Sequence, residues 1–352
     1  MPTACRSAGA AGNNRRFPRP KRHFPIKSRA FTELALEMTR IFIDGEAGTT
    51  GLQIAQRLTQ RSDLELARID PSARKDPEAR ARMLESADIA VLCLPDDAAR
   101  EAVALAGDRC RILDASTAHR TAEGWIYGLP ELKDGQRRQI AEASRVSNPG
   151  CYPQGFILLV RPLIEAGLLP ASLPLRIHGL SGFSGGGRPL IEAYEAFDEE
   201  TIERWNTRPY GLGLQHKHVP EMQRYAGCDL TPLFAPMVGH YYQGMLVQLP
   251  LFARELSTPA SPDDIRETLA RRYADEPFVS VLPTGAPDAL DGGFLAPTTC
   301  NHTNRIELMV FGHHDQFLLT ARYDNLGKGA SGAAIQNLNL MMGVDETTGL
   351  TR

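Results

Sequence analysis

Apolar residues over positions 38–150 fall into short continuous runs that alternate with helical patterns. The strand-like runs lie at 41–43, 64–69, 89–94 and 111–114. After the first run, apolar residues recur with helical spacing at Leu52, Ile54, Ala55 and Leu58. Strands that alternate with helices are typical of βαβ units around a mostly parallel sheet. This part of the chain is therefore predicted to be an α/β domain.

The pattern changes after residue 150. An apolar run at 156–160 predicts a helix that begins near residue 151, and further strand-like runs follow at 175–180, 233–237, 241–247, 306–310 and 316–321. We expect these strands to form an antiparallel sheet in an α+β domain over 151–323. A last helical run, 333–342, has no obvious partner in that domain. We therefore expect segment 324–345 to return to the first domain.

A glycine-rich turn separates the first strand from the first helix. Its glycines are spaced GxxGxxG at Gly45, Gly48 and Gly51. Such a turn lets the backbone approach a pyrophosphate and aims a helix N-terminus at its charge. A turn in an unrelated α/β unit is the alternative, and the flanking strand and helix argue against it. Outside the loop described next, the predicted dinucleotide-binding residues are Gly45, Ala47, Gly48, Thr49, Thr50, Gly51, Pro95, Ser116 and Asn325.

The loop after the second strand bears on the choice of dinucleotide. An acidic residue there favours a free ribose 2′-hydroxyl, whereas basic residues accept a 2′-phosphate. Asp70 is followed at once by Ser72, Arg74 and Lys75. We predict NADP(H), held by these last three residues. Asp70 argues for NAD(H). The alternative to a cofactor site is an exposed basic loop that binds no ligand.

One cysteine stands in a chemically suggestive context. Cys151 follows Ser147-Asn148-Pro149-Gly150 and precedes the apolar helical run. A thiol at a helix start meets the positive end of the helix dipole and free backbone N–H groups, which favour the thiolate. The same N–H groups can hold an oxyanion after attack on a carbonyl. A nucleophilic cysteine combined with a dinucleotide site indicates a dehydrogenase that works through a thioester.

Two loops are candidates for holding an anionic substrate. Ser116, Thr117 and Arg120 follow the strand at 111–114, at the sheet edge where ligands bind. The glycine-rich stretch 181–188, which ends at Arg188, can approach a phosphate or a nicotinamide closely. The alternatives are an ordinary polar loop for the first and an exposed flexible loop for the second.

His216 and His218 flank Lys217 in the second half of the chain. Histidine suits proton transfer near neutral pH, so one of these two is predicted to serve as the acid or base. In an extended backbone both imidazoles point to one side. The sequence does not decide between them. No third ligand stands at metal-like spacing, so no metal is predicted.

Composition narrows the range of partners. The 352 residues suffice for about two domains, and the net charge of −3 favours neither nucleic acid nor a membrane surface. No apolar run approaches the roughly 18–20 residues of a membrane-spanning helix. The six cysteines are scattered without a CxxC pair, which indicates a reducing, cytoplasmic setting.

Residues 1–37 differ from the rest of the chain. They carry eight Lys or Arg residues and two glutamates, a local charge of +6 that leaves −9 for the remainder. This segment is predicted to be disordered. It is either an organelle transit peptide or an artefact of a start upstream of Met38, and we favour the second interpretation.

Several motifs together resemble the shorter type of N-acetyl-γ-glutamyl-phosphate reductase over residues 38–345. They read FIDGEAGTTGLQI at 42–54, DASTAHR at 114–120, YGLPEL at 127–132, SNPGCYPQG at 147–155, SGFSGGGR at 181–188, HKHVPEM at 216–222 and DNLGKGASGAAIQNLNLM at 324–341. The resemblance implies a Rossmann domain over 38–150 and a glyceraldehyde-3-phosphate dehydrogenase-like catalytic domain. It also implies NADP(H) and a cytoplasmic homodimer or homotetramer.

The implied activity is the reduction of an acyl phosphate, N-acetyl-glutamyl 5-phosphate, to the 5-semialdehyde in arginine biosynthesis. Cys151 is the implied nucleophile. The candidate substrate-binding residues are Asn148, Arg120, Ser181, Ser184, Gly185, Gly186, Arg188 and Glu221. The alternatives are a sister acyl-phosphate reductase (aspartate-semialdehyde dehydrogenase or the lysine-pathway homologue), a non-redox cysteine hydrolase, and a catalytically idle NADP-binding protein.

Overall fold

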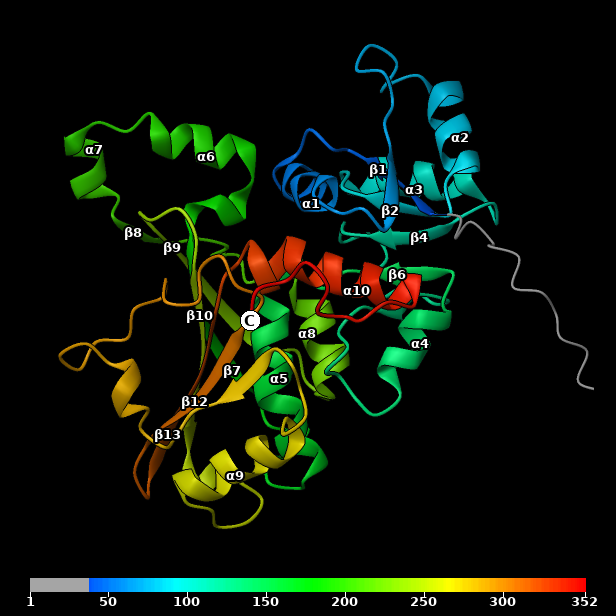
Figure 1. Cartoon of the computed structure of the whole chain (residues 1–352). Coiled ribbons are helices and arrows are strands. Elements are labelled where there is room, and N and C mark those ends of the chain that lie inside the picture. The colour runs from blue at the N-terminus through cyan, green and yellow to red at the C-terminus, as the bar shows by residue number, and fades with distance from the viewer. Residues whose placement is uncertain (1–37) are drawn as a thin grey trace, which may run out of the picture. The chain divides into compact units, whose positions relative to one another are not determined.

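A computed structural model of the chain describes residues 38–352, and the expectations for residues 1–37 lie outside this part. Its first sheet has the strand order β2-β1-β3-β4-β6-β5, with every neighbouring pair parallel (Figure 1). The strands are β1 (Thr39–Asp44), β2 (Leu64–Ala67), β3 (Ile89–Leu92), β4 (Arg111–Asp114), β5 (Ile126–Tyr127) and β6 (Arg145–Ser147). The predicted α/β organisation with a parallel sheet is confirmed.

Helices cover both faces of this sheet because neighbouring strand residues point to opposite sides. Ile41 and Ile43 pack in one apolar cluster with Leu58 of the first helix, whereas Phe42 packs in another with Ala99. The helices that follow these strands are α1 (Thr49–Thr59), α2 (Pro77–Ser86), α3 (Asp96–Ala106) and α4 (Gln136–Glu142). The two-sided core explains why the strands read as continuous apolar runs.

The second sheet has the order β11-β12-β13-β10-β7-β9-β8. Its strands are β7 (Arg176–Gly182), β8 (Thr207–Pro209), β9 (Leu233–Gly239), β10 (Met245–Phe252), β11 (Val279–Val281), β12 (Ile306–Gly312) and β13 (Gln316–Tyr323). The predicted purely antiparallel sheet is wrong, since β7–β9 and β11–β12 are parallel pairs. Long connections return the chain to the same end of the sheet, which the spacing of apolar residues does not reveal.

The predicted strand at 241–247 also begins later than expected. Gly244 has φ +111°, and a Cβ there would lie 2.6 Å from the carbonyl oxygen of Pro297. The chain therefore turns through 241–244 before β10 starts at Met245.

One face of the second sheet is covered by helices (Figure 1). The central one is α5 (Cys151–Glu165), which is flanked by α8 (Val219–Ala226) and α9 (Pro262–Arg272). Phe156, Leu159 and Val160 of α5 are completely buried in the main apolar cluster. Two short helices, α6 (Arg188–Glu195) and α7 (Glu199–Arg204), lie between β7 and β8. In residues 38–352, no helix is both long and apolar enough to cross a membrane.

The last helix, α10 (Gly332–Met342), packs beside α4 and the first sheet (Figure 1). Ala334, Ile335 and Leu338 belong to the same apolar cluster as Ile41 and Ile43. A π-helical turn, Gly327–Ser331, leads into this helix from β13. The end of the chain thus joins the two sheets.

Candidate active site

A cavity of about 610 Å³ lies where loops after β1, β4 and β6 meet residues of the second sheet. These loops stand at the carboxyl edge of the first sheet, which is the usual place for ligands in α/β proteins. The predicted residues that line the cavity are Thr49, Thr50, Arg120, Asn148, Cys151, Ser181, Ser184, Gly185, Gly186, His216, His218 and Asn325. Candidates for catalysis, cofactor binding and substrate binding thus share one cavity.

Cys151 is the first residue of α5, as predicted. Gly150 precedes the helix without a side-chain cap, and the first turn contains no acidic residue. The first backbone N–H groups of α5 therefore remain available to an anion at the thiol. The carbonyl oxygen of Cys151 accepts a hydrogen bond from the Tyr323 hydroxyl at 2.6 Å, which anchors the start of the helix on β13.

Three side chains from separate segments converge beside the cysteine. A Cβ on Gly150 would lie 2.6 Å from Arg120 Nη1, 2.6 Å from Glu221 Oε1 and 2.7 Å from His218 Nε2. These contacts are shorter than real Cβ contacts. Only glycine lets the three groups approach the backbone next to Cys151 this closely.

Glu221 is buried behind the cavity wall and is 1% exposed. Its Oε1 accepts from Arg120 Nη1 at 2.7 Å, and its Oε2 accepts from the Tyr127 hydroxyl at 2.7 Å and from Gly150 N at 3.0 Å. Both oxygens are thus occupied by groups of the protein. Glu221, predicted to bind substrate, does not line the cavity; it holds Arg120 and the backbone at Gly150 in place.

The two histidines differ in their surroundings. His218 is 6% exposed, and its Nδ1 has no hydrogen-bond partner within residues 38–352. His216 Nδ1 accepts a hydrogen bond from the backbone N–H of His218 at 3.2 Å. His218 is in the αR conformation rather than extended, so the one-sided arrangement of an extended backbone does not apply here. The rings are nevertheless neighbours, with centroids 4.7 Å apart.

Burial sets the protonation of this cluster. It raises the pKa of the Cys151 thiol to about 11, an effect that the neighbouring Arg120 guanidinium opposes. Burial lowers the pKa of His218 well below its ordinary value, and Arg120 adds to that shift. It also lowers the pKa of His216 to about 4. At neutral pH the cavity therefore holds a protonated thiol and uncharged histidines. This differs from the expectation that the helix dipole alone favours the thiolate.

The glycine-rich turn fits the pyrophosphate of a dinucleotide. A Cβ on Gly45, which has φ +91°, would lie 2.4 Å from the Cys93 carbonyl oxygen, and one on Gly51 would lie 2.4 Å from the Gly45 carbonyl oxygen. At Gly48, α1 begins with no side-chain cap and no acidic residue in its first turn. An uncapped helix start beside a close backbone turn is the geometry that accepts phosphate groups.

The loop after β2 is already occupied by its own hydrogen bonds. Asp70 Oδ1 accepts from Ser72 N at 2.8 Å and from the Ser72 hydroxyl at 2.5 Å. These bonds lower the pKa of Asp70, which stays ionised. Arg74 and Lys75 are exposed on the same loop. Asp70 Oδ1 thus already accepts two hydrogen bonds within the turn, whereas the side chains of Arg74 and Lys75 are exposed to solvent.

Models of known families match both parts of the chain. Residues 72–143 match the semialdehyde dehydrogenase NAD binding domain, and residues 151–325 match the semialdehyde dehydrogenase dimerisation domain. An N-acetyl-gamma-glutamyl-phosphate reductase 2 from Nostoc sp. is 54% identical over 318 residues, which cover 88% of this chain and 99% of the relative. The chain belongs to the N-acetyl-gamma-glutamyl-phosphate reductase family. A relative of that name from Burkholderia cenocepacia is 49% identical over 306 residues, 86% of this chain and 97% of the relative.

Solved structures agree with the family on the fold. Aspartate semialdehyde dehydrogenase II from Vibrio cholerae superposes with a TM-score of 0.64 at 15% identity, covering 87% of this chain and 99% of that one. An aspartate semialdehyde dehydrogenase from Francisella tularensis has a TM-score of 0.65 at 14% identity, covering 87% of this chain and 100% of that one. At this identity the likeness concerns the fold alone.

Other residues that were predicted to bind substrate or cofactor do not line this cavity. Arg188 is at the exposed start of α6, where its Nε donates to Glu192 Oε1 at 2.7 Å. Ser116 is buried and donates to Asp114 Oδ2 at 2.7 Å. The residues predicted for binding that do not line the cavity are Gly45, Ala47, Gly48, Gly51, Ser72, Arg74, Lys75, Pro95, Ser116, Arg188 and Glu221.

Sequence reasoning missed three lining residues that carry chemistry. Lys217 is an exposed cation between the two histidines. Arg208 lines the cavity while its guanidinium lies 3.9 Å from the Trp205 ring centroid and donates to the Tyr194 hydroxyl at 2.8 Å. Tyr210 donates to the Tyr152 hydroxyl at 3.3 Å. Lys217 stood inside a recognised motif, but no local signal marked Arg208 or Tyr210.

The segment 324–331 supplies part of the cavity wall through Asn325, Leu326, Gly329 and Ala330 and was noticed only as a motif. A Cβ on Gly329 would lie 3.1 Å from Cys151 Cβ. The completely buried Lys328 donates to Glu131 Oε1 and to Gln336 Oε1, each at 2.6 Å. Gln154 of α5 donates to the Lys328 carbonyl oxygen at 2.7 Å. Beside the thiol, this segment is thus fixed both to α5 and to the loop that carries Glu131.

Within the described part, one group of side chains places metal-ligand atoms within 4.8 Å of one another. It consists of His313, His314 and Asp315, all exposed at the turn between β12 and β13. None of the three lines the cavity.

Proposed function

We propose that this protein reduces N-acetyl-glutamyl 5-phosphate to N-acetyl-glutamate 5-semialdehyde with NADPH, through a thioester on Cys151, as a step of arginine biosynthesis. The supporting observation is the cysteine at the uncapped start of α5, with a buried neutral histidine and Arg120 beside it, in a family member 54% identical to a curated reductase. Each of these features serves a distinct step of the reaction.

In the first step, the Cys151 sulfur bonds to the acyl carbon and the bond from that carbon to the phosphate oxygen breaks. Phosphate leaves with the bonding electron pair, and the thiol proton passes to a base. Since burial holds the pKa of Cys151 near 11, the thiol needs such a base at neutral pH. The free N–H groups at the start of α5 stabilise the negative oxygen that forms during attack.

We assign the base to His218 rather than His216. His218 Nε2 stands beside Gly150, next to the cysteine, whereas His216 Nδ1 accepts from the backbone of His218. The thioester is then reduced to a hemithioacetal by the hydride described below. As this hemithioacetal collapses, the carbon–sulfur bond breaks, the aldehyde forms, and His218 returns the proton to the sulfur, which regenerates the thiol. His216 then supports the position of His218.

The dinucleotide is held by the turn from Gly45 to Gly51, with Thr49 and Thr50 at the cavity. When bound, NADPH supplies the hydride that reduces the thioester carbonyl carbon. Ser72, Arg74 and Lys75 are assigned to the 2′-phosphate, because Asp70 is engaged by Ser72. Asn325 and Ser184 contact each other at 3.0 Å at the cavity wall, where they limit the space for the nicotinamide.

The substrate carries two anionic ends, and the cavity presents cations for both. We assign the phosphate to Arg120 and the exposed Lys217, because both cations line the cavity and their charges lower the pKa values of Cys151 and His218. We assign the carboxylate to Arg208, whose guanidinium is fixed by Trp205 and Tyr194. Asn148, Ser181 and the Ser184–Gly186 loop complete the enclosure.

The deciding experiment is phosphate-dependent reduction of NADP⁺ with N-acetyl-glutamate semialdehyde, beside aspartate semialdehyde and beside NAD⁺. Turnover with the acetylated substrate and NADP⁺ alone supports the proposal. Turnover only with aspartate semialdehyde would instead indicate aspartate semialdehyde dehydrogenase activity, the activity in the names of the similar solved structures. Absence of redox turnover together with hydrolysis of an acyl ester supports the cysteine hydrolase.

We further propose a cytoplasmic homodimer or homotetramer. The model matched by residues 151–325 is described as a dimerisation domain. The five cysteines of the described part, Cys93, Cys110, Cys151, Cys228 and Cys300, are all free, as expected in a reducing compartment. Light scattering of the purified chain distinguishes the two assemblies, and a monomer contradicts both.

A further inference from the structure

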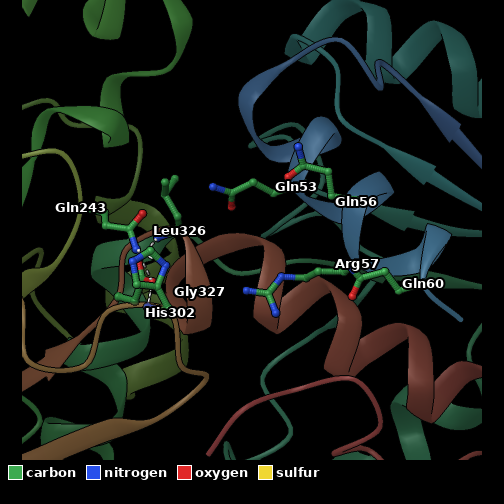
Figure 2. A pocket seen from close by; sticks show the side chains of 9 residues that line it. Gln53, Gln56, Arg57, Gln60, Gln243, His302, Leu326 and Gly327 are labelled. Carbon is green, nitrogen blue, oxygen red and sulfur yellow. Dashed lines mark hydrogen bonds between the residues drawn. The ribbon is translucent and has the colours of Figure 1, made fainter. Parts of the chain in front are cut away.

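A second cavity, of about 290 Å³, lies on the other side of the segment that walls the active site. Its lining is almost entirely polar and consists of Gln53, Gln56, Arg57, Gln60, Gln243, His302, Asp324, Leu326 and Gly327. Figure 2 shows α1 supplying one wall and the residues around His302 supplying the opposite one. The proposed reaction uses none of these side chains.

The α1 wall carries a cation without a counterion. Arg57 is half-buried and, within residues 38–352, makes no hydrogen bond or ion pair. Burial lowers the pKa of Arg57, and Asp324 only partly opposes this. In Figure 2 its guanidinium projects into the cavity, with Gln53 and Gln56 on the same helix and Gln60 just after its end. A partly desolvated guanidinium in this setting gains from a bidentate carboxylate.

The opposite wall carries the complementary charge. Asp324 is 2% exposed and accepts from Gln243 Nε2 at 3.0 Å, from His302 N at 2.8 Å and from Leu326 N at 2.9 Å. Its position is therefore fixed, and Arg57 lies beyond ion-pair distance. His302 is held at φ +64°, with Nδ1 3.2 Å from Gln243 Nε2. The cavity thus separates a fixed carboxylate from a free guanidinium.

This cavity is separate from the dinucleotide turn. The turn uses the start of α1, whereas Gln56 and Arg57 lie in its last turn and Gln60 directly follows its end at Thr59. From Thr50 to Arg57 the helix rises about 10 Å. A dinucleotide at the N-terminus of α1 therefore leaves these residues free.

We propose that this cavity binds a free α-amino acid in its zwitterionic form. Its carboxylate pairs with Arg57, and its ammonium group faces Asp324 and a glutamine side-chain oxygen. The glutamine amides both donate and accept hydrogen bonds, so they serve either end of such a ligand. A simple anion satisfies only Arg57, and a simple amine satisfies only the Asp324 side.

The ligand would act on the thiol through the segment between the two cavities. Leu326 lines both cavities. Asp324 also fixes this segment through its carbonyl oxygen, which accepts from Gly329 N at 2.9 Å, and Gly329 packs against Cys151. Occupation of the second cavity is therefore expected to change the turnover of the enzyme as well as its thermal stability.

The test is equilibrium dialysis of the full chain, saturated with NADP⁺, against a panel of radiolabelled L-α-amino acids. Their N-acetylated forms and decarboxylated amines are run beside them, together with acetate and phosphate. We expect saturable binding of at least one amino acid and none of its acetylated or decarboxylated counterpart. Binding is measured without turnover, so its failure is distinguishable from failure of the proposed reaction.

Two variants locate the site. Arg57→Met is expected to weaken binding about tenfold or more, the loss expected for a charge-assisted pair. Gln56→Glu, an exposed change on the same helix, places a negative charge beside Arg57 and should weaken binding similarly. Arg100→Met on exposed α3 is the matched control and should bind normally. A thermal melt and basal turnover of each variant confirm folding.

Three results overturn the proposal: no amino acid binds, binding is unchanged in both Arg57→Met and Gln56→Glu, or acetate or phosphate binds as tightly as the best amino acid. The last result assigns the cavity to a plain anion.

Discussion

The dinucleotide turn takes its backbone from one continuous stretch, residues 45–51, whereas the surroundings of Cys151 come from segments far apart in the chain. In the proposed function, the turn acts through main-chain N–H groups and through glycines that allow close packing. The proposed thiol site depends instead on the side chains of Arg120, His218 and Glu221, which converge on Gly150. A site made of backbone survives most side-chain changes, whereas a site made of converging side chains fails when one is removed.

The largest difference between the two regions is expected when the nucleophile Cys151 is replaced, because turnover should be lost while NADP⁺ binding remains. Cys151→Ser should lower kcat on the order of 10⁴-fold or more, because the hydroxyl is a far weaker nucleophile than a thiolate. NADP⁺ binding, measured by fluorescence titration, should remain within about twofold because the turn is intact. A Cys151→Ser enzyme with ordinary phosphate-dependent turnover removes the thioester from the mechanism.

Removal of the base should reveal the high pKa of the thiol. In the wild type, the pKa of His218 is lowered well below 6.5, so the histidine stays neutral and kcat/KM should not fall as pH drops from 8 through 6.5. His218→Gln should lose about 10²–10⁴-fold at neutral pH. Its residual rate should then rise about tenfold per pH unit between pH 7 and 10, because the thiol pKa is about 11 and only the thiolate reacts.

His216→Gln is the matched control for that experiment. It should lose less than about tenfold and keep the flat pH profile, because it acts only by supporting His218. If His216→Gln, and not His218→Gln, shows the sloping profile, the two assignments are reversed.

The wall of the thiol site should depend strongly on one buried ion pair. Lys328→Met leaves Glu131 charged and unpaired at 0% side-chain exposure, which should cost about 3–5 kcal/mol of unfolding free energy. Denaturant unfolding measures this loss. The double variant Lys328→Met/Glu131→Leu should recover much of it, since no buried charge then lacks a partner. An additive double variant would instead exclude coupling of the two residues.

Two glycines separate the effects on the two regions. Gly150→Ala places a Cβ within 2.7 Å of three functional side chains and should reduce kcat about 10²-fold, with KM for NADPH little changed. Gly51→Ala places a Cβ 2.4 Å from the Gly45 carbonyl oxygen and should mainly raise KM for NADPH. Gly48→Ala, whose Cβ would stand 3.5 Å from that oxygen, is the milder control. Initial-rate kinetics should show a lower kcat for Gly150→Ala and a higher KM for NADPH for Gly51→Ala.

The smallest effect is expected at the basic loop. Arg74→Ala should raise KM for NADPH about tenfold and leave KM for NADH unchanged, because the exposed cation meets only the 2′-phosphate. Arg82→Ala on exposed α2 is the control, with neither constant altered. Equal effects on both dinucleotides would remove Arg74 from the 2′-phosphate site.

The sequence by itself determined the features that depend on neighbouring residues. The strand–turn–helix around Gly45, Gly48 and Gly51 and the position of Cys151 at a helix start follow from local patterns, and the structure contains both. Apolar runs located most strands for the same reason, since burial of a face leaves its period in the chain.

Only the tertiary structure decided what depends on residues distant in sequence. It made β7–β9 and β11–β12 parallel, turned Glu221 toward Arg120 and Tyr127, and brought Arg208 to the cavity while Arg188 stayed outside. It also desolvated the Cys151 thiol beside the buried His218, which reversed the expected shift of the thiol pKa. Contacts between distant segments decide the direction of each strand, the hydrogen-bond partners of a side chain and the desolvation of an ionisable group. The local spacing of residues does not predict these properties.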